Sequence, residues 1–260
     1  MNGVIKGVLF DLDGTLLDTA QDMMEALNTV RAEEGLEPLS YETVRCQVSH
    51  GGHALVRLGF GTLPAEAHEA MRMRLLNLYR RQLAKHTALF EGGDEMLTEL
   101  ERRGLSWGIV TNKPGWLTDP LLVEVKLNSR ARAVVSGDTL SERKPHPMPL
   151  LHAAKEMGIA PGECVYVGDA ERDMQAAQAA GMYAVVAGYG YLGDDDKADA
   201  WFSHGWLDTP LELLDWLDSR GAPARPLNKV APARPLNKVA PARPLNNGAP
   251  ARASDKDGAA

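Results

Sequence analysis

Two carboxylates, Asp11 and Asp13, follow directly on an apolar run near the start of the chain. The residues from Val4 to Phe10 are typical of a buried strand, and Gly14 then permits a tight turn. Two acids this close repel each other unless a cation or a proton lies nearby, which favours chemistry at this turn. The alternative is an aspartate-rich turn bonded to its own backbone, and the pair alone does not decide between the two.

Polar residues also follow two later strands that the sequence predicts. Thr111 and Asn112 come directly after one of them, and Asp169 comes after another, with Asp173 one helical turn further on. Because parallel strands end at the same edge of a sheet, we expect these side chains to meet in one crevice. Lys144 lies in a loop that could bring an ammonium group to the same place.

Such a set of side chains is suited to phosphoryl transfer. Clustered carboxylates call for a divalent cation, and hard oxygen ligands favour Mg²⁺. A cation, a lysine and a hydroxyl donor can together hold a phosphoryl group. One carboxylate could attack phosphorus to form an aspartyl-phosphate, while a second, two residues on, exchanges the proton with the leaving alcohol and with water.

The elements that must position these residues alternate between strand and helix after residue 90, which predicts an α/β fold with a three-layer parallel sheet. A helix capped by Thr209, with Pro210 at its first position, is expected near the end. The predicted strands are Leu105–Val110, Ala133–Ser136, Cys164–Val167 and Tyr183–Val186. The predicted helices are Asp94–Arg103, Met148–Met157 and Asp173–Ala180.

About seventy residues of helical character separate the first strand from the second, far more than the few residues of an ordinary connection. Helices are expected over Tyr41–Val48 and Glu66–Ala88, with a further helix before Gly35. We therefore predict an all-helical cap domain over residues 18–90, inserted into a core domain of residues 1–17 and 91–221.

The last segment, residues 222–260, repeats the nonapeptide Ala-Pro-Ala-Arg-Pro-Leu-Asn-Lys-Val with decaying copies. Its frequent prolines and sparse apolar side chains cannot build a core, so it is expected to be a disordered or polyproline-like extension. A weak basic interaction arm is the alternative.

Composition limits the classes of function. The 260 residues carry a net charge of −7, so a nucleic-acid partner bound by a basic face is not expected. The two cysteines, Cys46 and Cys164, form no disulfide framework or zinc site and fit a reducing compartment. No apolar run approaches the length of a membrane span, and we expect a cytoplasmic protein, monomeric or homodimeric.

The motifs Asp11-Leu12-Asp13-Gly14-Thr15, Thr111-Asn112, Lys144-Pro145 and Gly168-Asp169-x-x-x-Asp173 resemble, in order, those of the haloacid-dehalogenase-like hydrolase superfamily. The resemblance implies a Rossmann-like core and identifies Asp11 as the nucleophile and Asp13 as the general acid/base. It assigns phosphate binding to residues Thr111, Asn112 and Lys144. It assigns Mg²⁺ to Asp11, the Asp13 carbonyl and Asp169, supported by Asp173.

Further stretches are similar to bacterial phosphoglycolate phosphatases and, closer still, to N-acetylmuramic acid 6-phosphate phosphatases. They include Val48-Ser49 before Gly51-Gly52, and Gly108 to Pro114. The resemblance implies a small phosphomonoester substrate, N-acetylmuramic acid 6-phosphate first and 2-phosphoglycolate second, with a sugar phosphomutase or an inactive binding module as further alternatives. Substrate choice is expected to involve the cap residues Ser49, His50, Gly51 and Gly52.

Single residues also have ordinary structural interpretations. Asp169 and Asp173 could serve only as a helix cap and a first-turn acid, and Thr111 could cap a turn. His50 and His53 lie three residues apart, but without further ligands nearby they indicate a cap loop or plain surface rather than a metal site.

Overall fold

The computed structural model describes residues 4–193 and 196–220, so the repeat segment lies outside the described residues. Six parallel strands form the central sheet in the order β5-β4-β1-β6-β7-β8. The chain adds β4 and β5 on one side of β1 and the later strands on the other, so the topology switches at β1. The strands are β1 (Gly7–Phe10), β4 (Ser106–Val110), β5 (Val134–Val135), β6 (Cys164–Gly168), β7 (Tyr183–Ala187) and β8 (Gly205–Leu207).

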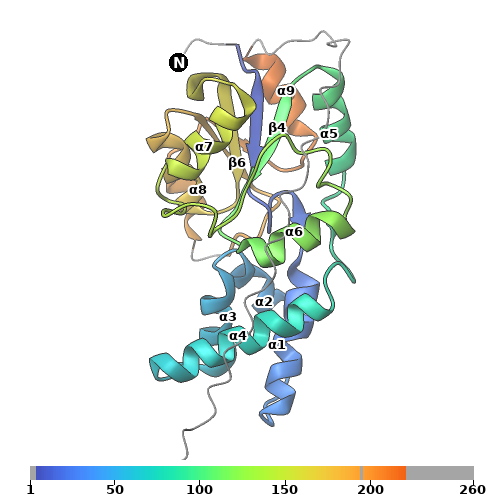
Figure 1. The fold of residues 1–260 in the computed structure, drawn as a ribbon, viewed down its shortest axis with the longest axis vertical. Helices are drawn as coiled ribbons and strands as arrows, with labels where there is room; N and C mark the ends of the chain where they lie inside the picture. Colours follow the sequence, from blue (N-terminus) through green and yellow to red (C-terminus); the bar gives the residue numbers. More distant parts are fainter. Residues whose placement is uncertain (1–3, 194–195, 221–260) are drawn as a thin grey trace, which may run out of the picture.

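Helices cover both faces of this sheet, which makes the predicted three-layer α/β architecture (Figure 1). Side chains that alternate along β1 enter different cores: Val8 and Phe10 pack with α5 and α9, whereas Leu9 packs with α7 and α8. Every residue of β1 is buried, as expected for a central parallel strand. The covering helices are α5 (Gly93–Arg102), α6 (Gly115–Glu124), α7 (Met148–Met157), α8 (Glu171–Ala179) and α9 (Glu212–Ser219).

Helix α6 is not among the helices that the sequence predicts. Pro120 lies inside the helix, where it cannot donate a hydrogen bond to the carbonyl of Trp116. Arg80 of helix α4 (Ala65–Arg81) supplies that bond through Nη1, at 2.8 Å from the Trp116 oxygen. A side chain distant in the sequence therefore compensates for the proline.

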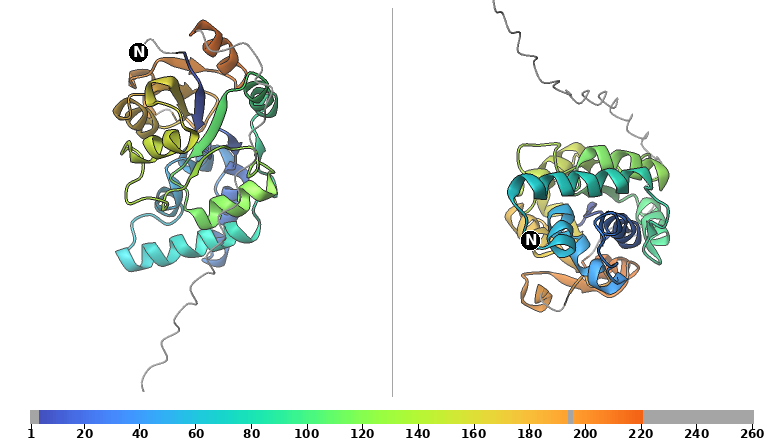
Figure 2. Two further views of the ribbon diagram at one scale, coloured as in Figure 1. Left: turned by 45° about the horizontal axis from the view of Figure 1, so that its top comes forward. Right: turned by 90° about the horizontal axis from the view of Figure 1, so that it is seen from below.

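Four helices pack together beyond the end of the sheet where the strands finish (Figure 1). Contacts between α1 and α2, α1 and α4, α2 and α3, and α3 and α4 close this four-helix cluster, and Figure 2 shows α4 lying across it. The helices are α1 (Ala20–Glu33), α2 (Tyr41–Val48), α3 (Gly51–Phe60) and α4 (Ala65–Arg81). Helix α2 has its predicted bounds, whereas α4 ends seven residues earlier than predicted.

Helix α3 was not predicted. Its glycines permit close helix packing: a Cβ at Gly59 would lie 2.8 Å from Leu27 Cδ1 of α1. A Cβ at Gly52 would lie 3.2 Å from Arg72 Cγ of α4. Both glycines therefore allow α3 to approach its neighbours.

The chain enters and leaves the four-helix cluster through an antiparallel pair of short strands, β2 (Leu17–Asp18) and β3 (Ala88–Leu89). Asp22, buried on α1, accepts hydrogen bonds from the amides of His86 and Thr87 and from the Thr87 hydroxyl. These contacts fix the returning segment against the start of α1.

The predicted start of the last helix is wrong by two residues. Helix α9 begins at Glu212 after Leu211, and Thr209 makes no side-chain cap. The Glu212 carboxylate instead accepts a hydrogen bond from the Asp208 amide at 2.8 Å. Among the described residues, no helix is both long and apolar enough to cross a membrane.

Candidate active site

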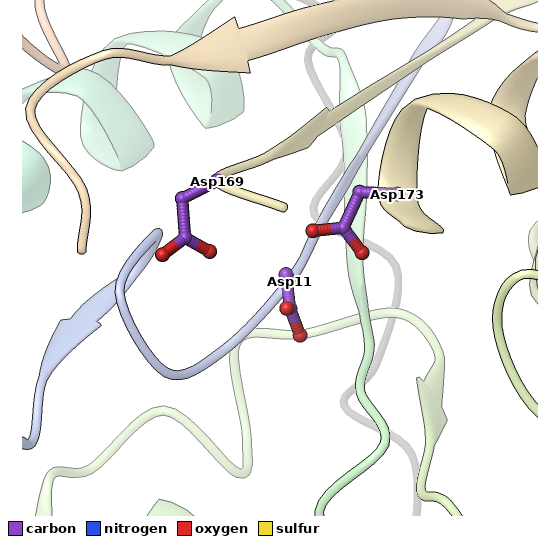
Figure 3. Close-up of side chains that lie close together, drawn as sticks. All are labelled: Asp11, Asp169 and Asp173. Carbon is purple, nitrogen blue, oxygen red and sulfur yellow. The ribbon is translucent and has the colours of Figure 1, made fainter. Parts of the chain in front are cut away.

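Asp11 lies at the carboxyl end of β1, between the ends of β4 and β6. Its amide donates to the Val167 carbonyl at 2.9 Å, which continues the pairing with β6 by one residue. One carboxylate oxygen from each of Asp11, Asp169 and Asp173 lies within 4.8 Å of the others, and all three residues are buried. Figure 3 shows the three side chains lying close together. The three carboxylates expected to meet at this edge of the sheet therefore do so.

Neutral donors surround the Asp169 carboxylate. Oδ1 accepts a hydrogen bond from the Thr15 hydroxyl at 3.1 Å, and Oδ2 accepts from the Ser49 hydroxyl at 2.6 Å and the Tyr191 amide at 3.0 Å. Burial, together with the charges of Asp11 and Asp173, raises the pKa of Asp169 to about 7. A cation at this position would relieve the repulsion that raises this pKa.

Lys144 brings a buried ammonium group to the same cluster. Its Nζ lies 2.9 Å from Asp11 Oδ1 and 2.8 Å from Asp173 Oδ1. The ammonium also donates to the Tyr166 hydroxyl at 2.7 Å, and that hydroxyl donates to the Val110 carbonyl. The loop that carries Lys144 is therefore tied through β6 to β4.

Asn112 fixes the backbone of this lysine. Its side-chain amide donates to the Lys144 carbonyl at 2.9 Å, and its side-chain oxygen accepts from the Lys144 amide at 3.1 Å. Thr111 is buried after β4, and its hydroxyl oxygen accepts from the Lys113 amide at 3.1 Å. Both residues stand at the expected edge of the sheet, and Asn112 contacts the lysine loop directly.

Asp13 points to different partners from those of Asp11. Its Oδ1 accepts from the Thr19 hydroxyl at 2.7 Å and from Lys113 Nζ at 2.9 Å. Lys113 Nζ also donates to the Tyr79 hydroxyl of α4 at 3.2 Å. Burial alone would lower the pKa of Lys113, but Asp13 and Tyr79 raise it above its usual value, so the ammonium stays charged at neutral pH.

The predicted cap residues lie where α2 meets α3. Ser49 contacts Asp169 directly and also donates to the Asp13 carbonyl at 3.3 Å. His50 faces Asp196, with 3.5 Å between Nε2 and Oδ1. Gly51 and Gly52 form the first turn of α3, and Gly52 packs on α4. Of these four residues, Ser49 is the one whose side-chain contacts reach the carboxylate cluster.

Four residues that shape the site were not predicted to do so: Lys113, Tyr166, Arg172 and Tyr191. Lys113 directly follows Thr111 and Asn112, and Arg172 lies between Asp169 and Asp173, so their places in the motifs were the available signal. Nothing in the sequence indicated that the hydroxyl of Tyr166 would meet Lys144.

The carboxylate cluster fits a hard divalent cation. Its donors are carboxylate oxygens, buried and close enough to share one ion, and oxygen donors of this kind suit Mg²⁺. The Asp13 carbonyl lies beside the same cluster, since it shares Ser49 Oγ with Asp169. The predicted ligands Asp11, Asp13 and Asp169 thus fit such an ion through two carboxylates and one carbonyl.

Comparisons with known proteins identify the family to which the chain is similar. A family model described as haloacid dehalogenase-like hydrolase matches residues 8–187. The chain is 46% identical over 211 residues to a phosphoglycolate phosphatase of Xanthomonas campestris, covering 81% of this chain and 95% of the relative. It is 37% identical over 216 residues to an N-acetylmuramic acid 6-phosphate phosphatase of Pseudomonas putida, covering 83% and 97%.

A solved structure has a similar fold. The crystal structure of a predicted phosphoglycolate phosphatase from Haemophilus somnus superposes with a TM-score of 0.73 at 25% identity, covering 82% of this chain and 98% of the other.

Proposed function

Because the chain belongs to the haloacid dehalogenase-like hydrolase family and is a phosphatase acting on small phosphorylated substrates, we propose that it is a Mg²⁺-dependent phosphomonoesterase working through an aspartyl-phosphate. The observation that carries the proposal is the buried cluster of Asp11, Asp169 and Asp173 with the Lys144 ammonium against two of its members. A bound Mg²⁺ would supply charge neutralisation for the phosphoryl oxygens.

The first half-reaction uses the two aspartates of the first motif. A carboxylate oxygen of Asp11 forms a bond to phosphorus while the bond between phosphorus and the leaving alcohol oxygen breaks. Asp13 gives its proton to that alcohol oxygen. Lys144 and Thr111 hold the phosphoryl group at the sheet edge, and Asn112 positions Lys144 through its backbone.

The second half-reaction returns the enzyme to its starting state. Asp13 removes a proton from a water molecule, whose oxygen attacks phosphorus. The bond between phosphorus and Asp11 breaks, which releases inorganic phosphate and restores both side chains. We assign the four-helix cluster the role of a cap, which would exclude other water from the crevice.

The substrate that we propose first is N-acetylmuramic acid 6-phosphate. The sequence stretches that resemble phosphatases of this compound include Ser49, whose hydroxyl contacts Asp169 in the carboxylate cluster. A residue at this position is suited to discriminate between substrates. The relatives at 46% identity are named phosphoglycolate phosphatases, so 2-phosphoglycolate is the second candidate. Both compounds carry a carboxylate besides the phosphate, and the interface between the four-helix cluster and the sheet contains the cations Arg45, Lys113 and Arg172.

Phosphate release from the two compounds, with Mg²⁺ or with a chelator, tests this proposal. We expect release that needs Mg²⁺, is faster from N-acetylmuramic acid 6-phosphate, and is lost in Asp11→Asn. Faster release from 2-phosphoglycolate would make that compound the preferred substrate instead. Activity that survives Asp11→Asn would overturn the mechanism, and transfer of phosphate to a second sugar hydroxyl without release would indicate a mutase.

A further inference from the structure

Ser49, at the end of α2, contacts two groups that we assign to the cation site. Its hydroxyl lies 2.6 Å from Asp169 Oδ2 and 3.3 Å from the Asp13 carbonyl oxygen. A carbonyl and a carboxylate from separate loops of the sheet are thus joined by one atom from the four-helix cluster.

The backbone of Ser49 is held by the first turn of α8, close to Asp169 in the sequence. Arg172 Nη2 donates to the Ser49 carbonyl at 2.5 Å, and Arg172 lies between Asp169 and Asp173 in the sequence. Burial disfavours the charged form of this guanidinium, but the charges of Asp173, Asp11 and Asp169 together raise its pKa above the usual value. The hydroxyl and the backbone carbonyl of Ser49 therefore both contact residues of the carboxylate cluster or residues beside it.

The rest of α2 is anchored next to the same carboxylate. Arg45 donates to the carbonyls of Tyr189 and Gly190 at 3.0 Å and 2.7 Å. The following residue, Tyr191, donates its amide to Asp169 Oδ2. Displacing α2 from the sheet would thus break contacts to Asp169 and to the loop that supports it.

The turn after Asp13 leaves room for these contacts. Gly14 has a φ of +83°, and a Cβ there would lie 2.1 Å from Asp169 Oδ2 and 2.8 Å from Ser49 Oγ. A side chain at this position would separate Ser49 from Asp169.

We propose that Ser49 is a positioning residue that couples cation binding to the closed arrangement of the four-helix cluster. Its hydroxyl orients the Asp169 carboxylate and the Asp13 carbonyl for the ion, as partners of metal ligands generally do. Coupling of this kind is reciprocal: closure strengthens cation binding, and the cation holds α2 against the sheet. The inference rests on the proposed Mg²⁺ site, and it adds that binding of the ion is coupled to the position of the four-helix cluster.

The test is calorimetric titration of Mg²⁺ into the full chain and three variants, without substrate. Ser49→Ala should bind Mg²⁺ about tenfold more weakly than the unchanged protein. Ser49→Thr keeps a hydroxyl and should bind nearly as tightly. Ser40→Ala is the matched control, because Ser40 caps the opposite end of α2 through Thr43 and should leave the affinity unchanged.

Hydrogen exchange of α2 supplies a second readout. Mg²⁺ should slow exchange across Tyr41–Val48 in the unchanged protein and in Ser40→Ala, and should slow it much less in Ser49→Ala. Equal Mg²⁺ affinity and equal protection in Ser49→Ala and the unchanged protein would overturn the inference alone. Failure of the unchanged protein to bind Mg²⁺ would overturn the proposed cofactor, and the inference with it.

Discussion

The ammonium of Lys113 lies 2.9 Å from Asp13 Oδ1, so a residue after β4 holds the side chain that we assign as general acid/base. The same ammonium donates to Tyr79 of α4. Lys113→Met should therefore lower kcat about 10- to 100-fold, because Asp13 loses the partner that fixes its orientation. Steady-state kinetics on whichever phosphomonoester proves to be the substrate measures the change.

The split between kcat and KM separates positioning from substrate binding. Loss of positioning lowers kcat with little change in KM, whereas loss of a substrate contact raises KM. Lys113→Arg keeps the charge and should recover part of kcat. Lys155→Met, an exposed lysine on α7, is the control. A kcat for Lys113→Met equal to that of the control would contradict the positioning role.

Most of the sheet could be predicted from the sequence because its information is local, whereas the edge strand β8 was not predicted. The apolar run that ends at Asp11 and the later polar strand ends needed only the rule that parallel strands finish at one edge. The meeting of Asp11, Asp169 and Asp173 follows from that rule. Helix α3 could not be predicted in the same way, since the role of Gly59 depends on Leu27 of another helix.

The supporting contacts of the site also depend on tertiary structure. That Tyr166 would meet Lys144 requires the loop before α7 to fold back over β6. Arg80 can replace the hydrogen bond lost at Pro120 only because α4 lies beside α6. Such pairs are distant in the sequence and leave no spacing pattern, so the positions of single motif residues were predictable and their partners were not.

The raised pKa of Asp169 predicts a pH dependence of cation binding. Burial and the charges of Asp11 and Asp173 bring this pKa to about 7, above the value of about 3.9 that an aspartate has in an unfolded chain. Between these values the folded protein binds a proton that the unfolded chain has lost, so without a cation stability falls as pH rises from about 4 to about 7. A cation must displace that proton at low pH.

Mg²⁺ should therefore raise Tm more at about pH 8 than at about pH 6, since less of Asp169 is protonated at the higher pH. Thermal unfolding with Mg²⁺ or with a chelator measures the difference at each pH. In the Asp169→Asn variant, Mg²⁺ should raise Tm only weakly at both pH values. A Tm shift that is the same at both pH values in the unchanged protein would contradict a protonated Asp169 in the cluster.

Tyr191 joins the loop after β7 to the start of α1. Its hydroxyl accepts from the amides of Thr19 and Ala20 at 2.5 Å and 2.9 Å and donates to Asp18 at 2.7 Å. Tyr191→Phe should cost about 2 kcal/mol of unfolding free energy, because buried amides lose an acceptor. Tyr189→Phe removes a single bond to the Thr15 carbonyl and should cost about 1 kcal/mol. Urea unfolding measures the unfolding free energy of both variants. Equal losses in the two variants would contradict the role of the Tyr191 hydroxyl as acceptor for the amides at the start of α1.

Asp22 holds the segment that returns from the four-helix cluster to the sheet. It is fully buried and accepts three hydrogen bonds, from the amides of His86 and Thr87 and from the Thr87 hydroxyl. Asp22→Ala should lower the unfolding free energy by about 3 kcal/mol, because these donors then lack a buried acceptor. Asp22→Asn keeps one acceptor oxygen, so its unfolding free energy should fall by less than that of Asp22→Ala.

Glu66→Ala is the control for this change, since Glu66 is an exposed acid in the first turn of α4 and should cost less than about 1 kcal/mol. Hydrogen exchange locates the effect: the Thr87 amide should exchange faster in Asp22→Ala before the central sheet does. Uniform loss of protection across the sheet would instead show that Asp22 stabilises the whole fold. Faster local exchange would place its effect at the β2–β3 connection, the point through which any movement of the four-helix cluster must pass.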